Sequence, residues 1–143
     1  EMSKSGHLLC NHSVHHKDMS QLNREEFEKE LRGVEDVCIS VTGKELSHFY
    51  RPPEGRYSKQ SLEWAREFGY KTVFWSFAYA DYNADNQMEP SKALNSYLKA
   101  KIHPGAVYLL HAVSSTNAEI LGDFIDYGRE NGYTFARLDS YGA

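Results

Sequence analysis

Short apolar runs alternate with amphipathic segments along the whole chain of 143 residues. Helical spacing or capping residues mark the amphipathic segments, which cover residues 23–42, 61–68, 91–101 and 116–130. The apolar runs are GHLLC (6–10), KTVFWSFAY (71–79), AVYLLH (106–111) and YTFARL (133–138), and HFYRPPEG (48–55) has the pattern of a strand end followed by a turn. This alternation predicts an α/β fold in which helices connect the strands of a parallel sheet.

The helical segments carry recognisable end signals. Asn23 and Glu26 have the spacing of a capping box, and Gly43 is typical of the residue that ends a helix. Ser91 is the expected N-cap of the third helix, and Thr116 or Asn117 is expected to begin the fourth. These signals set the expected boundaries of the helices.

Charge and hydropathy exclude two classes of function. The net charge is −4 and the 16 Lys and Arg residues are scattered, so no general basic field favours nucleic acid. No apolar run approaches the roughly 20 residues of a membrane span. EMSKSGHLLC lacks the pattern of a signal peptide, which predicts a cytosolic protein or a chain cut downstream of such a peptide.

A polar side chain follows four successive strand segments. They are His12, Arg51, Asp81 and His111. In parallel α/β folds the carboxyl ends of the strands lie at one edge, where function collects. We therefore expect these four residues to meet at that edge.

The stretch NHSVHH (11–16) places His12 and His16 four residues apart. If the segment coils as a helical turn, the two rings share one face, with Cβ atoms about 5–6 Å apart. Neutral imidazole is a common metal ligand, and a catalytic zinc usually takes three protein ligands and a water. The alternative is a hydrated surface loop, or histidines that cap a strand end.

The other three residues each allow two interpretations. Arg51 suits bidentate binding of a carboxylate, and the alternative is a surface salt bridge. Asp81 can orient a histidine or bind metal, and the alternative is a helix or turn cap. His111 can be a core histidine, or it can pair with an aspartate as a general acid.

These residues lie in motifs that resemble a known family. HSVHH, RPPEG, the aromatic strand ending in Asp81-Tyr82, and LLH resemble, in order and spacing, motifs two to five of the polysaccharide deacetylases, the nodulation-protein-B homology domain of carbohydrate esterase family 4. RPPEGRYS, WSFAYADYN and KIHPGAVYLLHAVSSTNAEIL are most similar to the muramic δ-lactam biosynthetic de-N-acetylases of spore formers, which act on peptidoglycan. The resemblance extends from Gly6 to about Leu138.

The resemblance implies a distorted (β/α) barrel and metal-dependent hydrolysis of an N-acetyl group on peptidoglycan, with N-acetylmuramic acid favoured over N-acetylglucosamine. His12 and His16 would be two ligands of a divalent metal, most simply zinc, although cobalt, nickel and manganese also suit imidazole. Arg51 would hold the catalytic base. Asp81 would orient His111, the general acid.

The resemblance also implies residues around the substrate. A backbone N–H near Glu54 or Gly55 would stabilise the oxyanion, and Trp75, Tyr82 and Leu109 would line the pocket for the acetyl methyl group. Glu54 stands where relatives often have an aromatic or basic residue, and Tyr82 where Trp is common. Both departures affect the expected sugar specificity more than the expected chemistry.

The first motif of the family, T-F-D-D-G, supplies the catalytic base and the third metal ligand, and no Asp-Asp pair occurs in the sequence. We therefore expect residues 1–143 to be the C-terminal part of one deacetylase domain whose first strand lies upstream of Glu1. An exposed sheet edge of this kind favours self-association. A catalytically inactive carbohydrate-binding remnant is the alternative, and the family implies an extracellular, cell-wall or spore location.

Overall fold

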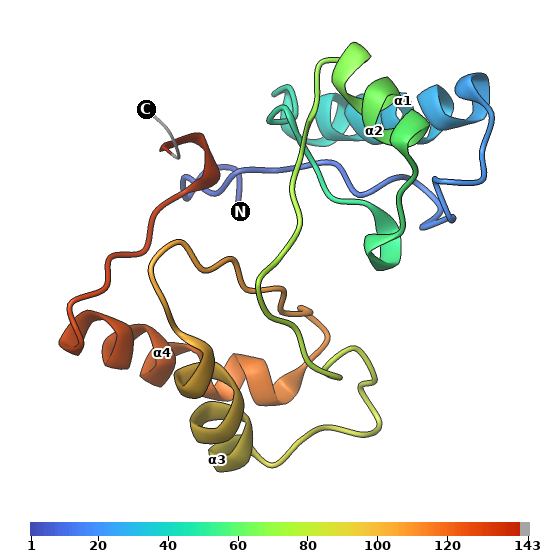
Figure 1. The fold of residues 1–143 in the computed structure, drawn as a ribbon. Coiled ribbons are helices and arrows are strands. Elements are labelled where there is room, and N and C mark those ends of the chain that lie inside the picture. Colours follow the sequence, from blue (N-terminus) through green and yellow to red (C-terminus); the bar gives the residue numbers. More distant parts are fainter. Residues whose placement is uncertain (141–143) are drawn as a thin grey trace. The chain divides into compact units, whose positions relative to one another are not determined.

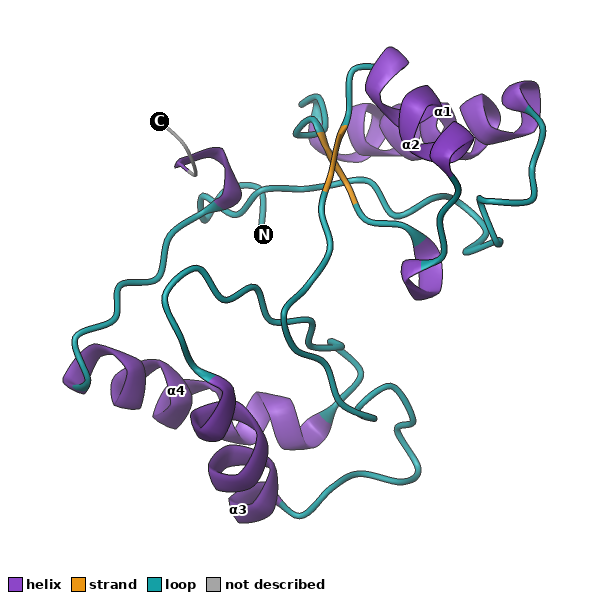
Figure 2. Ribbon diagram, viewed as in Figure 1, coloured by secondary structure: helices purple, strands orange, loops and turns teal. Residues whose placement is uncertain are grey.

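The computed structural model describes residues 1–140. The main elements in chain order are α1 (Arg24–Thr42), β1 (Phe49–Tyr50), α2 (Lys59–Glu67), β2 (Lys71–Thr72), α3 (Pro90–Lys92) and α4 (Ser115–Glu130) (Figure 1, Figure 2). A π-helix at Ala93–Leu98 and a 3₁₀ turn at Lys99–Lys101 continue α3, and further 3₁₀ turns cover Pro53–Gly55 and Leu138–Ser140. No helix in the described part is both long and apolar enough to cross a membrane.

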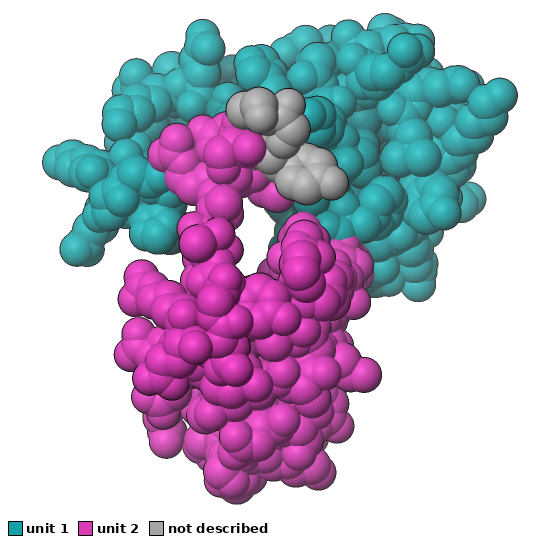
Figure 3. All heavy atoms as spheres, turned by 60° about the vertical axis from the view of Figure 1, so that its left-hand side comes forward, with its two compact units in different colours: residues 1–74 teal, residues 75–143 magenta. Residues whose placement is uncertain are grey.

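The chain forms two compact units, which Figure 3 shows in different colours. Unit 1 comprises Glu1–Phe74 and contains α1, α2 and both strands. Unit 2 comprises Trp75–Ala143 and contains α3 and α4. Each unit has its own hydrophobic core.

Helix α1 has the ends that its sequence predicts. The side chain of Asn23 accepts a hydrogen bond from the backbone N–H of Glu26 at 3.0 Å, and the Glu26 carboxylate accepts from the backbone N–H of Asn23 at 3.2 Å. Gly43 adopts a left-handed conformation with φ of 68° and donates its N–H to the carbonyl of Ile39. This reciprocal cap and left-handed stop confirm the predicted boundaries.

The core of unit 1 lies between α1, α2 and the strands. Phe27 and Leu31 on α1 are fully buried, and the ring of Phe27 contacts those of Tyr50 and Trp64 edge-on. Full burial of each large apolar side chain contributes roughly 1.5–3 kcal/mol. This packing fixes α1 against the strand that precedes Arg51.

The strands of unit 1 are parallel, as predicted, but shorter. Phe49 and Tyr50 pair with Lys71 and Thr72. The 6–10 run forms no strand, and Asn11 directly after it makes an isolated bridge to Tyr50. Residues 73–79 were expected to continue the strand, but the last bond to β1 runs from Val73 N–H to the Tyr50 carbonyl at 2.8 Å. Pro52 and Pro53 follow one residue after β1 and lack an N–H, so β1 gives its neighbours only a short ladder.

In unit 2 the helix expected from Ser91 begins earlier. Glu89 is its N-cap, because its carboxylate accepts the backbone N–H groups of Ser91 at 2.9 Å and Lys92 at 2.8 Å. Pro90 then occupies the first helical turn, where its missing N–H costs nothing. The core packs this helix against α4 through Ala93, Leu94, Leu98, Ile120 and Phe124.

The strands expected in unit 2 are largely absent from the described residues. Phe77 and Tyr108 form one parallel bridge, and 133–138 forms no strand before the turn at Leu138–Ser140. The bridge is flanked by hydrogen bonds from Ser76 N–H to the Val107 carbonyl and from Leu109 N–H to the Phe77 carbonyl. An isolated pair of segments has no second neighbour to extend its ladder.

Helix α4 begins slightly before its expected start. Ser114 is the N-cap and accepts the backbone N–H of Asn117 at 3.0 Å. The helix ends at Glu130, as predicted. This cap directs the first turn of α4 toward the segment that ends at His111.

Candidate functional site

The histidine loop, residues 11–16, is not helical. Ser13 and His16 have left-handed backbones, with φ of 64° and 53°, which excludes the regular turn that the sequence suggested. The rings of His12 and His16 nevertheless lie together, with centroids 5.0 Å apart and the rings edge to face. The expected pairing is therefore present, but a strained loop produces it.

The ring of His12 is oriented by the backbone of Arg51. The parallel bridge between Asn11 and Tyr50 places the two following residues side by side, and His12 Nδ1 lies 2.6 Å from the Arg51 carbonyl oxygen. A carbonyl oxygen can only accept, so Nδ1 carries the hydrogen and Nε2 carries the lone pair of the neutral ring. Metal-binding histidines are commonly oriented in this way.

Asn11 fixes the start of the histidine loop from inside unit 1. This side chain is 1% exposed, and its amide donates to the Leu31 carbonyl at 2.9 Å and to the Tyr70 hydroxyl at 3.0 Å. Its oxygen accepts the backbone N–H of Ser13 at 3.0 Å. The loop is therefore tied to α1 and to the residue before β2.

Arg51 is half-buried, and burial lowers the pKa of its guanidinium. Among residues 1–140, no Asp or Glu forms an ion pair with it, so the alternative of a surface salt bridge does not hold there. Glu54 and Gly55 follow in a tight turn with φ of 55° and 70°. Gly55 donates its N–H to the Pro52 carbonyl at 3.1 Å. Of the two N–H groups expected to bind the oxyanion, the N–H of Glu54 is therefore the better candidate.

In unit 2 the structure brings Asp81 and His111 together. Both follow segments joined by the bridge between Phe77 and Tyr108. Asp81 is 1% exposed, and one carboxylate oxygen lies 2.7 Å from His111 Nδ1 while the other accepts the backbone N–H of His111 at 2.7 Å. Burial alone would raise the pKa of Asp81, but the hydrogen bonds from His111 and Asn117 outweigh it and lower that pKa.

Asn117 is a residue of this cluster that the motifs did not identify. Its amide donates to Asp81 Oδ2 at 2.6 Å, and its oxygen accepts the hydroxyl of Tyr79. The sequence held one signal for it: an amide side chain in the first turn of the helix expected after LLH. Asp81 therefore has three donors on its two oxygens.

The residues expected around the substrate differ in how exposed they are. Tyr82 is 67% exposed and its ring meets that of His111 edge-on, with centroids 6.0 Å apart. Leu109 is buried and Trp75 is half-buried. Their role as a pocket for the acetyl methyl group stays a prediction.

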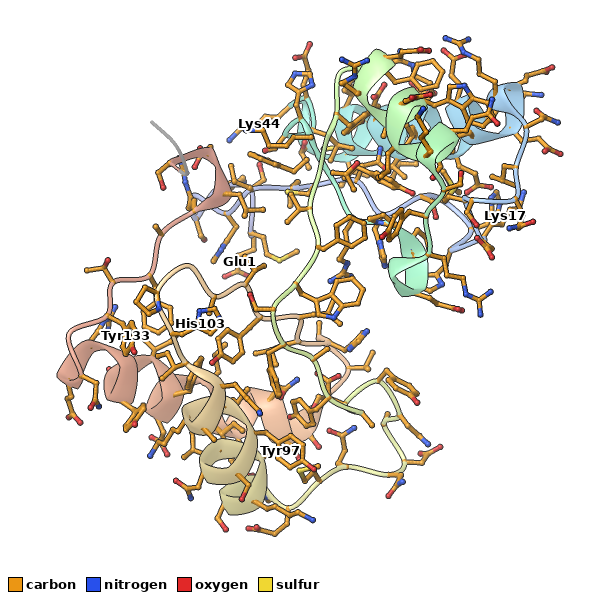
Figure 4. The ribbon with its side chains drawn as sticks, viewed as in Figure 1. Glu1, Lys17, Lys44, Tyr97, His103 and Tyr133 are labelled. Atoms are coloured by element: carbon orange, nitrogen blue, oxygen red, sulfur yellow. The ribbon has the colours of Figure 1, made fainter. Side chains whose placement is uncertain are left out.

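A cavity of about 550 Å³ lies elsewhere in unit 2, between α4 and the segments 102–110 and 132–136. His103 and Tyr133, labelled in Figure 4, belong to its lining. Within the described residues, neither Asp81 nor His111 lines it. Size alone would favour this cavity as a ligand site, but the titratable cluster lies outside it.

Two observations bear on a metal at the histidine loop. The Nδ1 contact of His12 leaves Nε2 as the nitrogen with the lone pair, and the ring of His16 lies beside it, so the residue types fit a divalent ion. Residues 1–140 contain no group of three or more His, Cys, Asp or Glu that could hold a metal ion. The loop thus offers two of the three protein ligands that a catalytic zinc usually takes.

Comparison with known proteins identifies the family. A family model described as polysaccharide deacetylase matches residues 1–73. Peptidoglycan-N-acetylmuramic acid deacetylase PdaA of Bacillus subtilis is 41% identical over 138 residues, which are 96% of this chain and 52% of that protein. The chain thus spans about half the length of this curated relative.

Solved structures agree with the family match. The structure of Bacillus subtilis PdaA, a family 4 carbohydrate esterase, is 40% identical and superposes with a TM-score of 0.91, covering 96% of this chain and 58% of that one. A family 4 pseudoenzyme from Bacillus anthracis is 26% identical, with a TM-score of 0.80 and coverage of 91% and 44%. The expected fold class is confirmed, and the chain belongs to the polysaccharide deacetylase family.

Proposed function

We propose that this protein hydrolyses the N-acetyl groups of peptidoglycan amino sugars and releases acetate. The observation that carries the proposal is the double contact of Asp81 with the ring and the backbone of His111. Family membership and the similarity to a peptidoglycan deacetylase supply the substrate class. The finer assignment to N-acetylmuramic acid, zinc and muramic δ-lactam formation in the spore wall rests on the motif resemblance.

His111 is the general acid of the proposed reaction. Because Asp81 accepts from Nδ1 and holds the ring in place, the proton is exchanged at Nε2. Water adds to the amide carbon, the C–N bond breaks, and Nε2 gives its proton to the leaving amine. The products are acetate and the free amino sugar.

Unit 1 supplies the other proposed groups. His12 and His16 would hold a divalent ion, which when bound polarises the amide carbonyl and lowers the pKa of a bound water. Arg51 orients the carboxylate of the catalytic base, and the N–H of Glu54 donates to the developing oxyanion. We further propose that the protein acts outside the cell, in the cell wall or spore wall.

A second candidate is a carbohydrate-binding protein without hydrolytic activity. It is favoured by the lack of a third metal-ligating side chain beside the histidine pair among residues 1–140. The likeness to a solved pseudoenzyme of the same family shows that such a fold exists without the activity. Tyr82 and Trp75 would then serve only to contact sugar.

Acetate release from N-acetylated peptidoglycan, with zinc present, tests both candidates. We expect His111→Ala to lower turnover by about 10²–10⁴-fold with unchanged zinc content. His103→Ala is the control, because it removes an exposed histidine of the same unit that does not contact Asp81. Near-normal turnover of His111→Ala refutes the acid role, and sedimentation with peptidoglycan without acetate release supports the second candidate.

A further inference from the structure

Glu30 is a buried carboxylate that the proposed mechanism does not use. It lies on α1 and is 4% exposed. Its oxygens accept the backbone N–H of Val14 at 3.0 Å and of His15 at 2.9 Å, and they contact His15 Nδ1 at 2.9 Å and Lys17 Nζ at 3.0 Å. Figure 4 shows Lys17 on the segment that precedes α1. All four of these donors come from the histidine loop or the residue that follows it.

Side-chain oxygens accept the backbone N–H groups of four consecutive residues in this loop. Asn11 accepts from Ser13 at 3.0 Å, and Ser13 Oγ accepts from His16 at 3.0 Å. Glu30 accepts the two in between, at 3.0 and 2.9 Å. Glu30 is thus the one acceptor of this set that lies outside the loop's own sequence.

The loop needs such support because of its backbone. Ser13 and His16 are left-handed at φ of 64° and 53°, and a non-glycine residue pays of the order of 1–2 kcal/mol in that region. The loop also lies directly on α1: a Cβ added at Gly33, one turn after Glu30, would come within 2.7 Å of Val14 Cγ2. Loss of the hydrogen bonds to Glu30 would let Ser13 and His16 leave the left-handed conformation. The His16 ring would then turn away from His12.

We propose that Glu30 is a positioning residue that holds His12 and His16 side by side. It acts through the peptide groups of Val14 and His15 and touches neither ring of the pair. Only acceptance of these two N–H groups is needed, so an amide oxygen in place of the carboxylate is sufficient. The inference rests on the proposed metal role of the histidines only in its second readout.

The first readout uses the metal-free chain. An NOE between ring protons of His12 and His16 reports the 5.0 Å pairing. We expect this NOE in the wild type and in Glu30→Gln, and we expect its loss in Glu30→Met, which has similar volume but no acceptor. Glu25→Met is the matched control, since Glu25 lies on the same helix and bonds to Lys29 instead of the loop.

The second readout is zinc affinity, measured by competition with a chelating dye. We expect the dissociation constant to rise about 10–100-fold in Glu30→Met and to stay near the wild-type value in the Gln and control variants. A wild type that does not bind zinc but shows the NOE pattern refutes the metal role alone and leaves the positioning role supported. Retention of both the NOE and the affinity in folded Glu30→Met overturns the positioning role.

A third measurement covers the case in which Glu30→Met does not fold. In the wild type, the amide protons of Val14 and His15 should exchange with solvent slowly, as expected for hydrogen-bonded groups. The amide of Lys17, which is not held by Glu30, gives the internal reference. Exchange of Val14 and His15 at the rate of an unstructured peptide overturns the proposal.

Discussion

The ring Nδ1 of His12 lies 2.6 Å from the backbone carbonyl oxygen of Arg51. Because a carbonyl cannot donate, this contact selects the tautomer with hydrogen on Nδ1. We expect a long-range ¹H–¹⁵N spectrum of the metal-free chain near pH 8 to show His12 almost entirely as this tautomer. The exposed ring of His7 is the comparison within the same spectrum. A His12 signal typical of hydrogen on Nε2 would contradict the assignment.

Asn117 is expected to contribute to folding through Asp81. Removal of its amide in Asn117→Ala takes one of three donors from a buried carboxylate, at 2.6 Å from Oδ2. The free energy of unfolding should fall by about 1.5–3 kcal/mol, the usual scale for hydrogen bonds to charged groups. Urea denaturation measures it. Asn95→Ala, at an exposed helical site, should change the unfolding free energy by less than about 0.5 kcal/mol, and an equal effect of both variants would refute the assignment.

Glu30 is expected to make the free energy of unfolding depend on pH. Burial alone would raise the pKa of this carboxyl. The hydrogen bonds from the His15 backbone and ring and from Lys17 outweigh burial and lower the pKa from its ordinary 4.5 to about 2. The folded state therefore binds the proton less tightly than the unfolded state. Its contribution, roughly 3 kcal/mol, is present above pH 4.5 and is lost as the pH falls toward 2.

Thermal unfolding between pH 6 and pH 2 tests this acid dependence. The fall in Tm with decreasing pH should be shallower in Glu30→Gln than in the wild type, because the amide does not titrate. Glu25→Gln removes an exposed carboxylate of the same helix and should follow the wild-type curve closely. Parallel curves for the wild type and Glu30→Gln would count against the lowered pKa.

Gly33 and Val14 are expected to be energetically coupled. Ala in place of a mid-helix Gly normally stabilises a helix by up to about 1 kcal/mol. In this chain the added Cβ would meet Val14 Cγ2 at 2.7 Å, so the β-branched side chain or the loop must move. Gly33→Ala should therefore stabilise the Val14→Ala background by more than it stabilises the wild type. Additive effects in this double-mutant cycle would show that the loop does not lie on α1.

Local signals predicted the helices well. Asn23, Glu26 and Gly43 determine the ends of α1 through contacts within a few residues, which a sequence displays directly. The start of α3 was predicted wrongly, because Glu89 is not among the favoured N-cap residues, yet its carboxylate accepts the N–H groups of Ser91 and Lys92. The strands were predicted too long, because a ladder depends on partners that a segment's own residues do not reveal.

The contacts of the candidate residues were also predicted only in part. The proximity of His12 to His16 and of Asp81 to His111 followed from spacing and from strand ends. The left-handed loop, Glu30 and Asn117 did not, because each depends on a helix that packs onto a distant segment. That all four strand-end residues act in one site, and that the chain is part of one domain, stay predictions.

The hydrogen bonds of Asp81 to both the backbone and the ring of His111 limit how position 81 can change in evolution. The same two oxygens that fold the segment also aim the imidazole, so no substitution at 81 alters one property alone. A stabilising mutation elsewhere could restore folding to such a variant, but the ring would remain misdirected. A descendant without the proposed activity could therefore lose Asp81 only after another contact had replaced its hydrogen bonds to His111.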